Sequence, residues 1–507
     1  MDKEVRSYRQ ILRSSSIIGG ASVINVAIGL GRTKVVALLL GPIGVGLIGL
    51  FGNLMGTASA VAGLGFGNVG TRQIAEAAAG GKDPEIAAAR RALFWGTMVL
   101  ALLGGLVVWL LRRPLARVVL GDASHDGDVG WLAIGVALSV AGASQGALLN
   151  GLRRIGDIAR CSVYGVLLST GLGVGALFLW GDRGLMLFVL SVPLSGFLIG
   201  HYFVTRLPRI QTPPTSLTIL ATQWNQLARL GFAFMVAGLA GTLAQLFVRS
   251  LVHRELGAVA LGHFQASWAI SMTYIGFVLQ AMGTDFYPRL TGVIHDHSQA
   301  NRLVNEQTEV ALLLAAPVLL GMLALAPWII KMLYTKSFAP AVAVFRWQVL
   351  GDVLKVASWP LGFILLAAGD GRMFVLTEFS VFGVFVLLTW AGIPLLGVEA
   401  TGIAFFAMYA VLLPLVYWLG QRRTGFRWLR SVWYQLSALM LAAGFIAVLA
   451  MWRVDLGAVA GSFLAALFGL HALARLSQMT VLGGRLGRFG DIAKKIINRC
   501  AIWNGRY

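Results

Sequence analysis

Long apolar segments alternate with short polar ones along almost the whole chain. A helix crosses a bilayer in about 20 apolar residues, and about fourteen segments reach that length. Polar residues inside these segments recur at helical spacing and not at the alternating positions of a strand. The pattern therefore predicts an all-α polytopic membrane protein. The expected spans are residues 15–39, 44–66, 90–111, 129–150, 158–180, 185–204, 229–250, 260–282, 308–330, 342–367, 374–396, 399–419, 432–452 and 456–475.

The tenth expected span carries a polar stripe near its centre. Gln348, Asp352, Lys355 and Trp359 lie at i, i+4, i+7 and i+11, so they share one face of a helix. Each charge there costs about 2.5–3.5 kcal/mol on insertion scales and must face protein, water or a ligand. In one interpretation Asp352 and Lys355 neutralise each other and only hold neighbouring helices together. In the other, which we favour, the stripe and Arg346 one turn outward line a solvated cavity.

A few more charged residues lie inside the expected spans. Arg32 and Lys34 stand well past the midpoint of the first span, so they either snorkel to the headgroups or face the protein interior. Arg249 has the same two interpretations at the end of the seventh span. The intramembrane acids Asp352 and Glu378 are natural sites for a coupling proton or sodium ion, although each can also pair with a nearby cation.

Aromatic residues beside the stripe are the candidates for stacking on a sugar, namely Trp347 and Trp359. The sequence has no HExxH motif, nucleophile elbow, phosphate-cradling loop or paired metal-binding carboxylates. The largest outer loop, residues 112–129, is too short for a catalytic domain. We therefore expect a transporter and not an enzyme, with neither a metal nor a cofactor.

Composition and charge support a membrane protein. Of 507 residues, 57% are hydrophobic and only 12% are charged, which no soluble globule of this size shows. The formal charge of +20 would suggest nucleic acid as a partner in a soluble protein, but here most cations lie in loops. With the N-terminus inside, 28 Lys and Arg residues fall in inner segments and 9 in outer loops, so both termini are expected to be cytoplasmic.

The two halves of the chain contain a weak internal repeat. Gly41 and Gly46, after Leu40, recur with the same spacing as Gly257 and Gly262, at an offset of 216 residues. Two six-span halves of the same orientation fit this recurrence. Cations flank both copies at similar distances: Arg32 and Arg72 in the first, Arg249 and Arg289 in the second.

This repeat sets the expected domain organisation. A first lobe covers residues 1–205, and a cytoplasmic linker with two adjacent prolines covers 206–229. A second lobe follows at 230–423, then two further spans at 424–476. The remainder, 477–507, is a basic amphipathic tail that we expect to lie on the inner membrane surface.

Three stretches resemble the Wzx-type flippases of the superfamily that also contains multidrug extruders and lipid II flippases. They are LLGPIGVGLIGLFGNL at 39–54, TDFYPRL at 284–290, and FRWQVLGDVLKVASWPLGFILLAAGDGRMFVLTEFSVF at 345–382. The segment with WQxxGDVLK is most similar to the subgroup that includes the translocase for enterobacterial common antigen lipid III. The last two spans and the tail depart from that subgroup.

The resemblance implies a V-shaped, two-lobed bundle in the bacterial inner membrane. Such a protein moves undecaprenyl-diphosphate-linked oligosaccharide from the cytoplasmic to the periplasmic leaflet through a cationic lumen. Matching positions make Trp347, Gln348, Asp352, Lys355 and Glu378 the leading candidates. The expected partners are this glycan lipid, membrane lipids and a polysaccharide polymerase or chain-length regulator, with no nucleic acid.

Two other functions stay open: a cation-coupled multidrug exporter of the same superfamily, and a membrane polysaccharide-assembly enzyme. For the flippase, Asp352 and Glu378 are the expected ion-coupling residues. The residues expected to bind substrate are Arg32, Lys34, Arg72, Arg249, Arg289, Arg346, Trp347, Gln348, Lys355 and Trp359.

Overall fold

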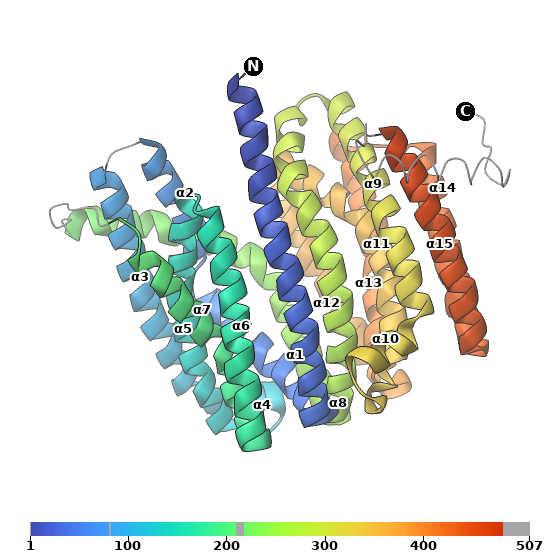
Figure 1. Ribbon diagram of the computed structural model, residues 1–507, viewed down its shortest axis with the longest axis horizontal. Helices are drawn as coiled ribbons and strands as arrows, with labels where there is room; N and C mark the ends of the chain where they lie inside the picture. Colours follow the sequence, from blue (N-terminus) through green and yellow to red (C-terminus); the bar gives the residue numbers. More distant parts are fainter. Residues whose placement is uncertain (1, 81–82, 209–216, 480–507) are drawn as a thin grey trace. The chain divides into compact units, whose positions relative to one another are not determined.

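The protein is built from helices (Figure 1), and the computed structural model describes residues 2–80, 83–208 and 217–479. No strand occurs in these ranges, so the expected all-α class is confirmed. The α-helices are α1 (Asp2–Ala62), α2 (Phe66–Gly80), α3 (Asp83–Leu110), α4 (Arg112–Leu120), α5 (Asp126–Gly151), α6 (Ile155–Trp180), α7 (Leu185–Thr205), α8 (Leu217–Val293), α9 (His297–Ala324), α10 (Ala326–Leu333), α11 (Ala341–Ala367), α12 (Gly371–Leu396), α13 (Glu399–Thr424), α14 (Arg430–Trp452) and α15 (Val454–Met479). Short 3-10 helices cover Gly181–Gly184 and Lys336–Phe338.

Ten helical segments in the described ranges are long and apolar enough to cross a membrane, or eleven if one bent pair counts as a span. Three of them each extend over two of the expected spans. These are Gly19–Ala62, Ile155–Thr205 and the bent pair Leu220–Val236 with Gly238–Gly276. The protein is therefore a multi-pass membrane protein, and the count of fourteen spans stays a prediction.

The two longest helices are interrupted at the glycines of the sequence repeat. Gly41 in α1 has φ 59° and ψ −161°, and Gly257 in α8 has φ 84° and ψ 174°. Backbone of this kind is almost closed to residues with a Cβ. The recurrence of a glycine at an offset of 216 residues therefore has a structural cause, because each copy bends its helix at that point.

The second glycine of each copy lies at a close approach between α1 and α8. A Cβ on Gly46 would lie 2.7 Å from the backbone nitrogen of Gly262, and a Cβ on Gly262 would overlap the carbonyl oxygen of Pro42. Small residues let membrane helices come together in this way, since lipid offers no hydrophobic drive for their association. The four repeat glycines thus serve two purposes, bending and close packing.

By its internal contacts the chain divides into two compact units, and the division falls inside α8. Unit 1 is Met1–Gly262 with the short segment Leu333–Ser337, and unit 2 is the rest. The expected lobe boundary at 206–229 stays a prediction, because residues 209–216 lie outside the described ranges. Most of the expected tail, from 480 onward, lies outside them too.

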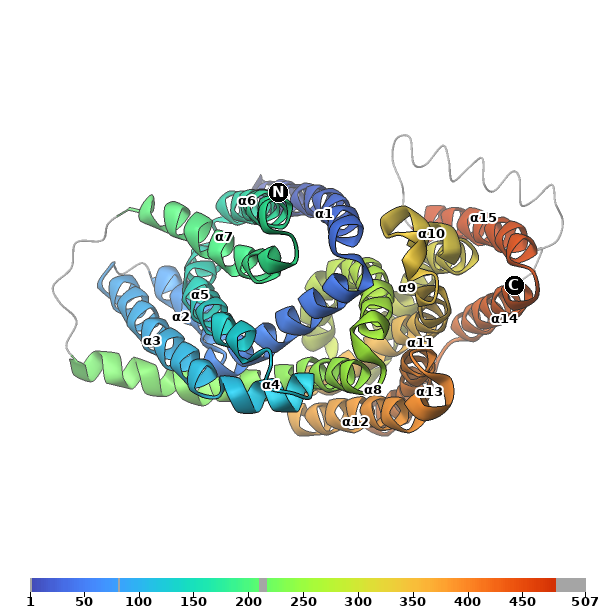
Figure 2. The same cartoon turned by 90° about the horizontal axis from the view of Figure 1, so that it is seen from below.

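In unit 1, α5 packs against α1, α2, α3 and α7 (Figure 2). The first part of α8 is bonded to this bundle at two places. The indole nitrogen of Trp224 donates to the carbonyl of Ala92 in α3 at 2.8 Å, and the Ser250 hydroxyl donates to the carbonyl of Val119 in α4 at 2.7 Å. Unit 1 therefore also includes the part of α8 that follows the expected linker, up to Gly262.

In unit 2, α11 is the central helix and packs against α9, α12, α13 and α14. In its most apolar window 72% of the residues are buried, compared with 22% in α12. A helix enclosed in this way keeps its polar side chains from lipid. The polar stripe noted in the sequence is on this helix.

Candidate functional site

The stripe on α11 faces the interior of unit 2. Gln348 and Asp352 have no exposed surface, and Lys355 and Trp359 are partly buried. Four residues spread over three helical turns therefore share an inward-facing side, as their spacing predicts. The sequence made this stripe the leading candidate, and its orientation brings it against three other helices.

Asp352 is held by a hydroxyl from the second part of α8. Ser271, itself fully buried, donates to Asp352 Oδ2 at 2.5 Å. The other carboxyl oxygen, Oδ1, has no hydrogen-bond partner among the described residues. A buried carboxyl oxygen without a partner is costly, and such groups are rare unless they take up a proton, an ion or a ligand.

Gln348 lies one helical turn before Asp352, and its side chain also lacks hydrogen-bond partners among the described residues. Neither its amide nitrogen nor its amide oxygen has a partner in the described part of the chain. An amide can both donate and accept hydrogen bonds. Together with Asp352 Oδ1, the stripe presents three unpaired polar atoms inside a helical bundle that crosses the membrane.

Lys355 reaches a cavity of about 260 Å³ between α11, α12 and α13. Its Nζ lies 3.3 Å from the sulfur of Met272, and 5.9 Å and 5.7 Å from the ring centroids of Phe405 and Tyr409. Rings at this distance attract a cation through their faces. Glu378 of α12 lines the same cavity, so the cavity contains one cation, one carboxylate and aromatic faces.

The close ion pair that would make the stripe purely structural is not formed. No nitrogen–oxygen contact within 4 Å joins Lys355 to Asp352 or to Glu378 in the described residues. Both carboxylates still influence the lysine electrostatically. The three charges are therefore near one another without being locked together, which leaves each able to exchange partners.

The two tryptophans beside the stripe have different surroundings. Trp359 lines the cavity with Lys355 and lies edge-on to Phe363, with 4.6 Å between ring centroids. Trp347 instead donates from its indole nitrogen to Glu399 at the start of α13, at 2.8 Å. The structure thus brings Trp359 to the cavity, while Trp347 joins α11 to α13.

Arg346 also lies away from this cavity. One of its terminal nitrogens donates to the carbonyl of Ala450 in α14 at 3.4 Å. Its Nε and its other terminal nitrogen are buried without a partner among the described residues. Arg346 is therefore a second partly satisfied polar group on α11, directed toward α14.

The candidate cations of unit 1 have separate partners. Arg32 donates to the Ser169 hydroxyl at 3.5 Å and stacks on the ring of Phe188 at 4.1 Å, so it is directed toward α6 and α7. Lys34 donates to the carbonyl of Tyr334. Arg249 is only 4% exposed and bonds the side chain and carbonyl of its own helix neighbour, Gln245.

Two further candidates are on the surface of their units. Arg72 pairs with Glu76 at 2.7 Å, with both side chains well exposed. Arg289, in unit 2, is exposed on α8. The twelve candidates are divided between the two units. Within unit 2, the structure places Gln348, Asp352, Lys355, Trp359 and Glu378 on or beside α11. The role of all twelve residues stays a prediction.

Several residues of this site could not be identified from the sequence. Ser271, Met272 and Tyr409 lie in apolar segments without a motif, and only the packing of α8 and α13 on α11 brings them there. Hydroxyls and aromatic rings suit a polar or sugar-bearing ligand. A carboxyl group with a free oxygen suits a proton or a monovalent cation.

Sequence comparison relates the chain to polysaccharide biosynthesis proteins and lipid III flippases. Residues 35–343, more than half of the chain, match the family described as polysaccharide biosynthesis protein. The chain is 24% identical over 427 residues to the lipid III flippase of Escherichia coli (strain K12), covering 82% of this chain and 99% of that protein. The lipid III flippase of Shigella flexneri matches to the same extent. The resemblance to Wzx-type flippases seen in the sequence is confirmed.

Solved structures share the fold. The lipid II flippase MurJ in an inward closed conformation has a TM-score of 0.69 and 11% identity, covering 91% of this chain and all of that one. An inward-facing multidrug resistance transporter of the MATE family has a TM-score of 0.62 and 16% identity, covering 82% of this chain and 98% of the other. The chain shares its fold with these two structures, and by its sequence it belongs to the polysaccharide biosynthesis protein family.

Proposed function

We propose that the protein is a flippase for a lipid-linked oligosaccharide. Its substrate is an undecaprenyl-diphosphate-linked repeat unit of a surface polysaccharide, such as O-antigen, which moves from the cytoplasmic to the periplasmic leaflet of the inner membrane. Both termini are cytoplasmic in this proposal. The family, the named activity of the Escherichia coli and Shigella flexneri relatives, and the MurJ-like fold all support it.

The observation that carries the proposal is the inward-facing polar stripe of α11. A diphosphate sugar headgroup cannot cross hydrocarbon unaided, because its charges and hydroxyls would lose their water. Lys355 in its cavity, and the unpaired amide of Gln348, offer hydrogen bonds that replace that water. Trp359 in the same cavity offers a ring face for a sugar. No covalent step is needed, so we propose a transporter and not an enzyme.

We further propose alternating access, in which the two lobes rock about the linker at 206–229 while the polyprenyl chain stays in lipid. The other candidate cations, such as Arg32 and Arg249, would contact the diphosphate along its path. A polysaccharide polymerase or chain-length regulator would receive the translocated unit.

Two energy sources fit this mechanism. Moving one charge across the membrane is worth about 2.3 kcal/mol per 100 mV, so an anionic headgroup travels outward downhill when the interior is negative. The rival is proton or sodium antiport through Asp352 and Glu378. In proteoliposomes, Asp352→Asn and Glu378→Gln should abolish the dependence on an ion gradient while lipid binding persists. If reversing an imposed potential leaves the wild-type rate unchanged, the potential is not the source.

The proposal is tested by flipping of an undecaprenyl-diphosphate glycan in proteoliposomes. Lys355→Gln should slow flipping by about 30-fold, the equivalent of about 2 kcal/mol for one lost charged contact. Lys331→Gln, an exposed lysine of α10 that the proposal does not use, is the matched control. Both variants should keep the wild-type melting temperature within a few degrees. Equal rates for the two variants would remove the assigned role of the cavity.

The second candidate is a cation-coupled multidrug exporter, which the carboxylate of Glu378 in the cavity favours. A cationic drug would be attracted by the carboxylate of Glu378 and repelled by the ammonium group of Lys355. Lys355→Gln should then increase drug export where the flippase proposal requires a loss of glycan flipping. Measuring both substrates on one variant distinguishes the two functions.

A further inference from the structure

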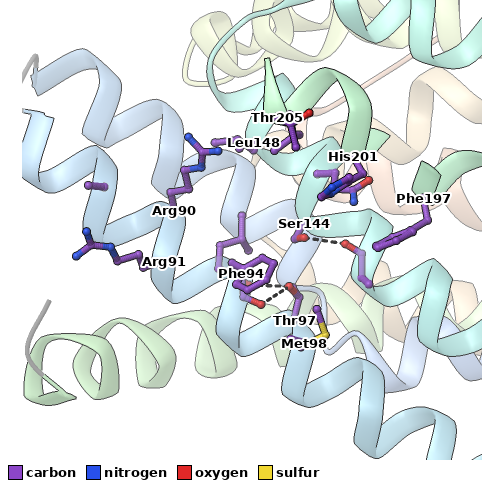
Figure 3. Close-up of a pocket in the computed structure, with 15 residues that line it drawn as sticks. Arg90, Arg91, Phe94, Thr97, Met98, Ser144, Leu148, Phe197, His201 and Thr205 are labelled. Atoms are coloured by element: carbon purple, nitrogen blue, oxygen red, sulfur yellow. Dashed lines mark hydrogen bonds between the residues drawn. The ribbon is translucent and has the colours of Figure 1, made fainter. Parts of the chain in front are cut away.

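Unit 1 contains a pocket that none of the candidate residues above touches. It has a volume of about 780 Å³ and is lined by α3, α5 and α7 (Figure 3). Pockets of about 300–1,000 Å³ are the usual size for small-molecule ligands. It lies toward the end of unit 1 where α3 begins and α7 ends, the end that we expect from the sequence to be cytoplasmic.

The described residues of the pocket lining include basic but no acidic side chains. Arg90, Arg91 and His201 are among the fifteen residues that line it, and none of these fifteen described residues is acidic. Arg90 is half-buried, and among the residues that the structure describes it forms no hydrogen bond or ion pair. In Figure 3 its guanidinium extends toward Leu148 and Thr205, whereas Arg91 extends away from them. Arg90 is therefore a cation available to an anionic ligand.

Among the residues that line the pocket, Gln145 has a buried polar atom without a partner in the described part of the chain. Gln145 of α5 is only 9% exposed, and its Oε1 accepts no hydrogen bond from the described residues. The neighbouring hydroxyls of Ser144 and Thr97 are already bonded to carbonyls of their own helices. α7 has a glycine, Gly200, where it meets Gln145, because a Cβ there would overlap Oε1.

Much of the pocket lining is apolar. Leu93, Met98 and Phe197 line it, as does Phe94, which is 48% exposed. Such a surface suits a hydrocarbon chain. The ligand that fits therefore combines an anion for Arg90, a hydrogen-bond donor for Gln145 and an apolar tail.

We propose that this pocket binds the headgroup of an acidic glycerophospholipid as a resident lipid. The phosphate contacts Arg90, a glycerol hydroxyl donates to Gln145 Oε1, and the acyl chains run along Phe94. A choline headgroup lacks a hydroxyl donor and would place its own cation beside Arg90. This lipid site is separate from the α11 site and does not depend on the proposed flippase activity.

The test is lipid binding to delipidated full-length protein in neutral detergent, followed by native mass spectrometry. Dioleoylphosphatidylglycerol should bind at least tenfold more tightly than dioleoylphosphatidylcholine. Arg90→Gln should weaken phosphatidylglycerol binding about tenfold, and Gln145→Leu about threefold, by loss of one charged and one neutral hydrogen bond. Arg422→Gln is the matched control, since this arginine of unit 2 stacks on Trp418 at 3.9 Å and does not line the pocket.

Four results would overturn the proposal. The two lipids could bind equally, or Arg422→Gln could lose as much binding as Arg90→Gln, which would indicate nonspecific annular lipid. Inorganic phosphate could displace the lipid at equal concentration, which would make this a site for the free anion. An undecaprenyl diphosphate could displace phosphatidylglycerol at lower concentration, which would place the pocket on the path of the substrate.

Discussion

The two kinked helices, α1 and α8, have the same backbone device but different side-chain chemistry. Both bend at a glycine with positive φ, and both place a second glycine five residues later at their mutual crossing. Their cations have different contacts: Arg32 donates to Ser169 of α6 and stacks on Phe188 of α7, while the contacts of Arg249 include Gln245 of its own helix. The glycines are fixed by the path of the chain, whereas the charged residues are free to differ between copies.

The largest effect is expected where the two copies touch. Gly262→Ala should destabilise the protein by about 3 kcal/mol, since its Cβ overlaps the Pro42 carbonyl and the helices must separate. Gly46→Ala should be nearly as severe. Gly52→Ala and Gly276→Ala are matched controls, because a Cβ at either meets no neighbouring atom of the described residues within 4 Å. Thermal or denaturant unfolding in detergent measures all four. If the two crossing glycines tolerate alanine as well as the controls do, the close approach is wrong.

The kinks themselves come next. Gly41→Ala and Gly257→Ala should each lower the free energy of unfolding by about 2 kcal/mol, because a residue with a Cβ is strained at these backbone angles. A clash adds nothing, since no neighbouring atom of the described residues lies within 4 Å of the added Cβ. The comparison predicts similar losses in the two copies. A large loss at Gly41 with none at Gly257 would mean that only the first copy, where Pro42 follows the glycine, needs its bend.

A smaller effect should appear in the second copy alone. Ser271→Ala removes the donor to Asp352 and should cost about 1 kcal/mol, whereas the position 216 residues earlier is Met55, which has no hydroxyl. Ser267→Ala is the control, since in the described part of the chain this equally buried serine bonds only to carbonyls of its own helix. Both the free energy of unfolding and the flipping rate should be lower for Ser271→Ala than for Ser267→Ala. Identical behaviour would show that the bond to Asp352 contributes nothing.

The smallest effect is expected at the exposed cations that follow each copy. Arg72→Gln breaks a surface ion pair with Glu76 that salt screens, so the melting temperature should not change measurably. Arg289→Gln should behave in the same way. Flipping assays on both variants test whether the cations are substrate contacts. Slower flipping at an unchanged melting temperature would support their assignment as substrate contacts. An unchanged flipping rate would contradict it.

Much of the fold follows from local sequence. The spans expected at 342–367 and 374–396 are found as α11 at Ala341–Ala367 and α12 at Gly371–Leu396, since apolar length is a local property. The path of α8 was not predictable in the same way. Its membership of both units is decided by packing between segments far apart in sequence, and apolar periodicity does not say which helices meet.

The site was predictable only in part for the same reason. Spacing on α11 shows that Gln348, Asp352 and Lys355 share a face, and that face is buried. Spacing does not show that Ser271 would be the partner of Asp352. Nor does it show that Trp347, next to Gln348 in sequence, bonds Glu399 and not a ligand. Those outcomes depend on the neighbouring helix at each turn.

The bonds of Trp224 to Ala92 and of Ser250 to Val119 have a consequence for dissecting the protein. A fragment that ends at the proline-containing linker would lack the helical chain up to Gly262 and would expose the apolar faces that this chain covers. The two halves of the gene are therefore not two autonomous folding modules. Co-expression of two separate halves should give folded protein only when the second fragment contains the helical chain up to Gly262 that packs on the first.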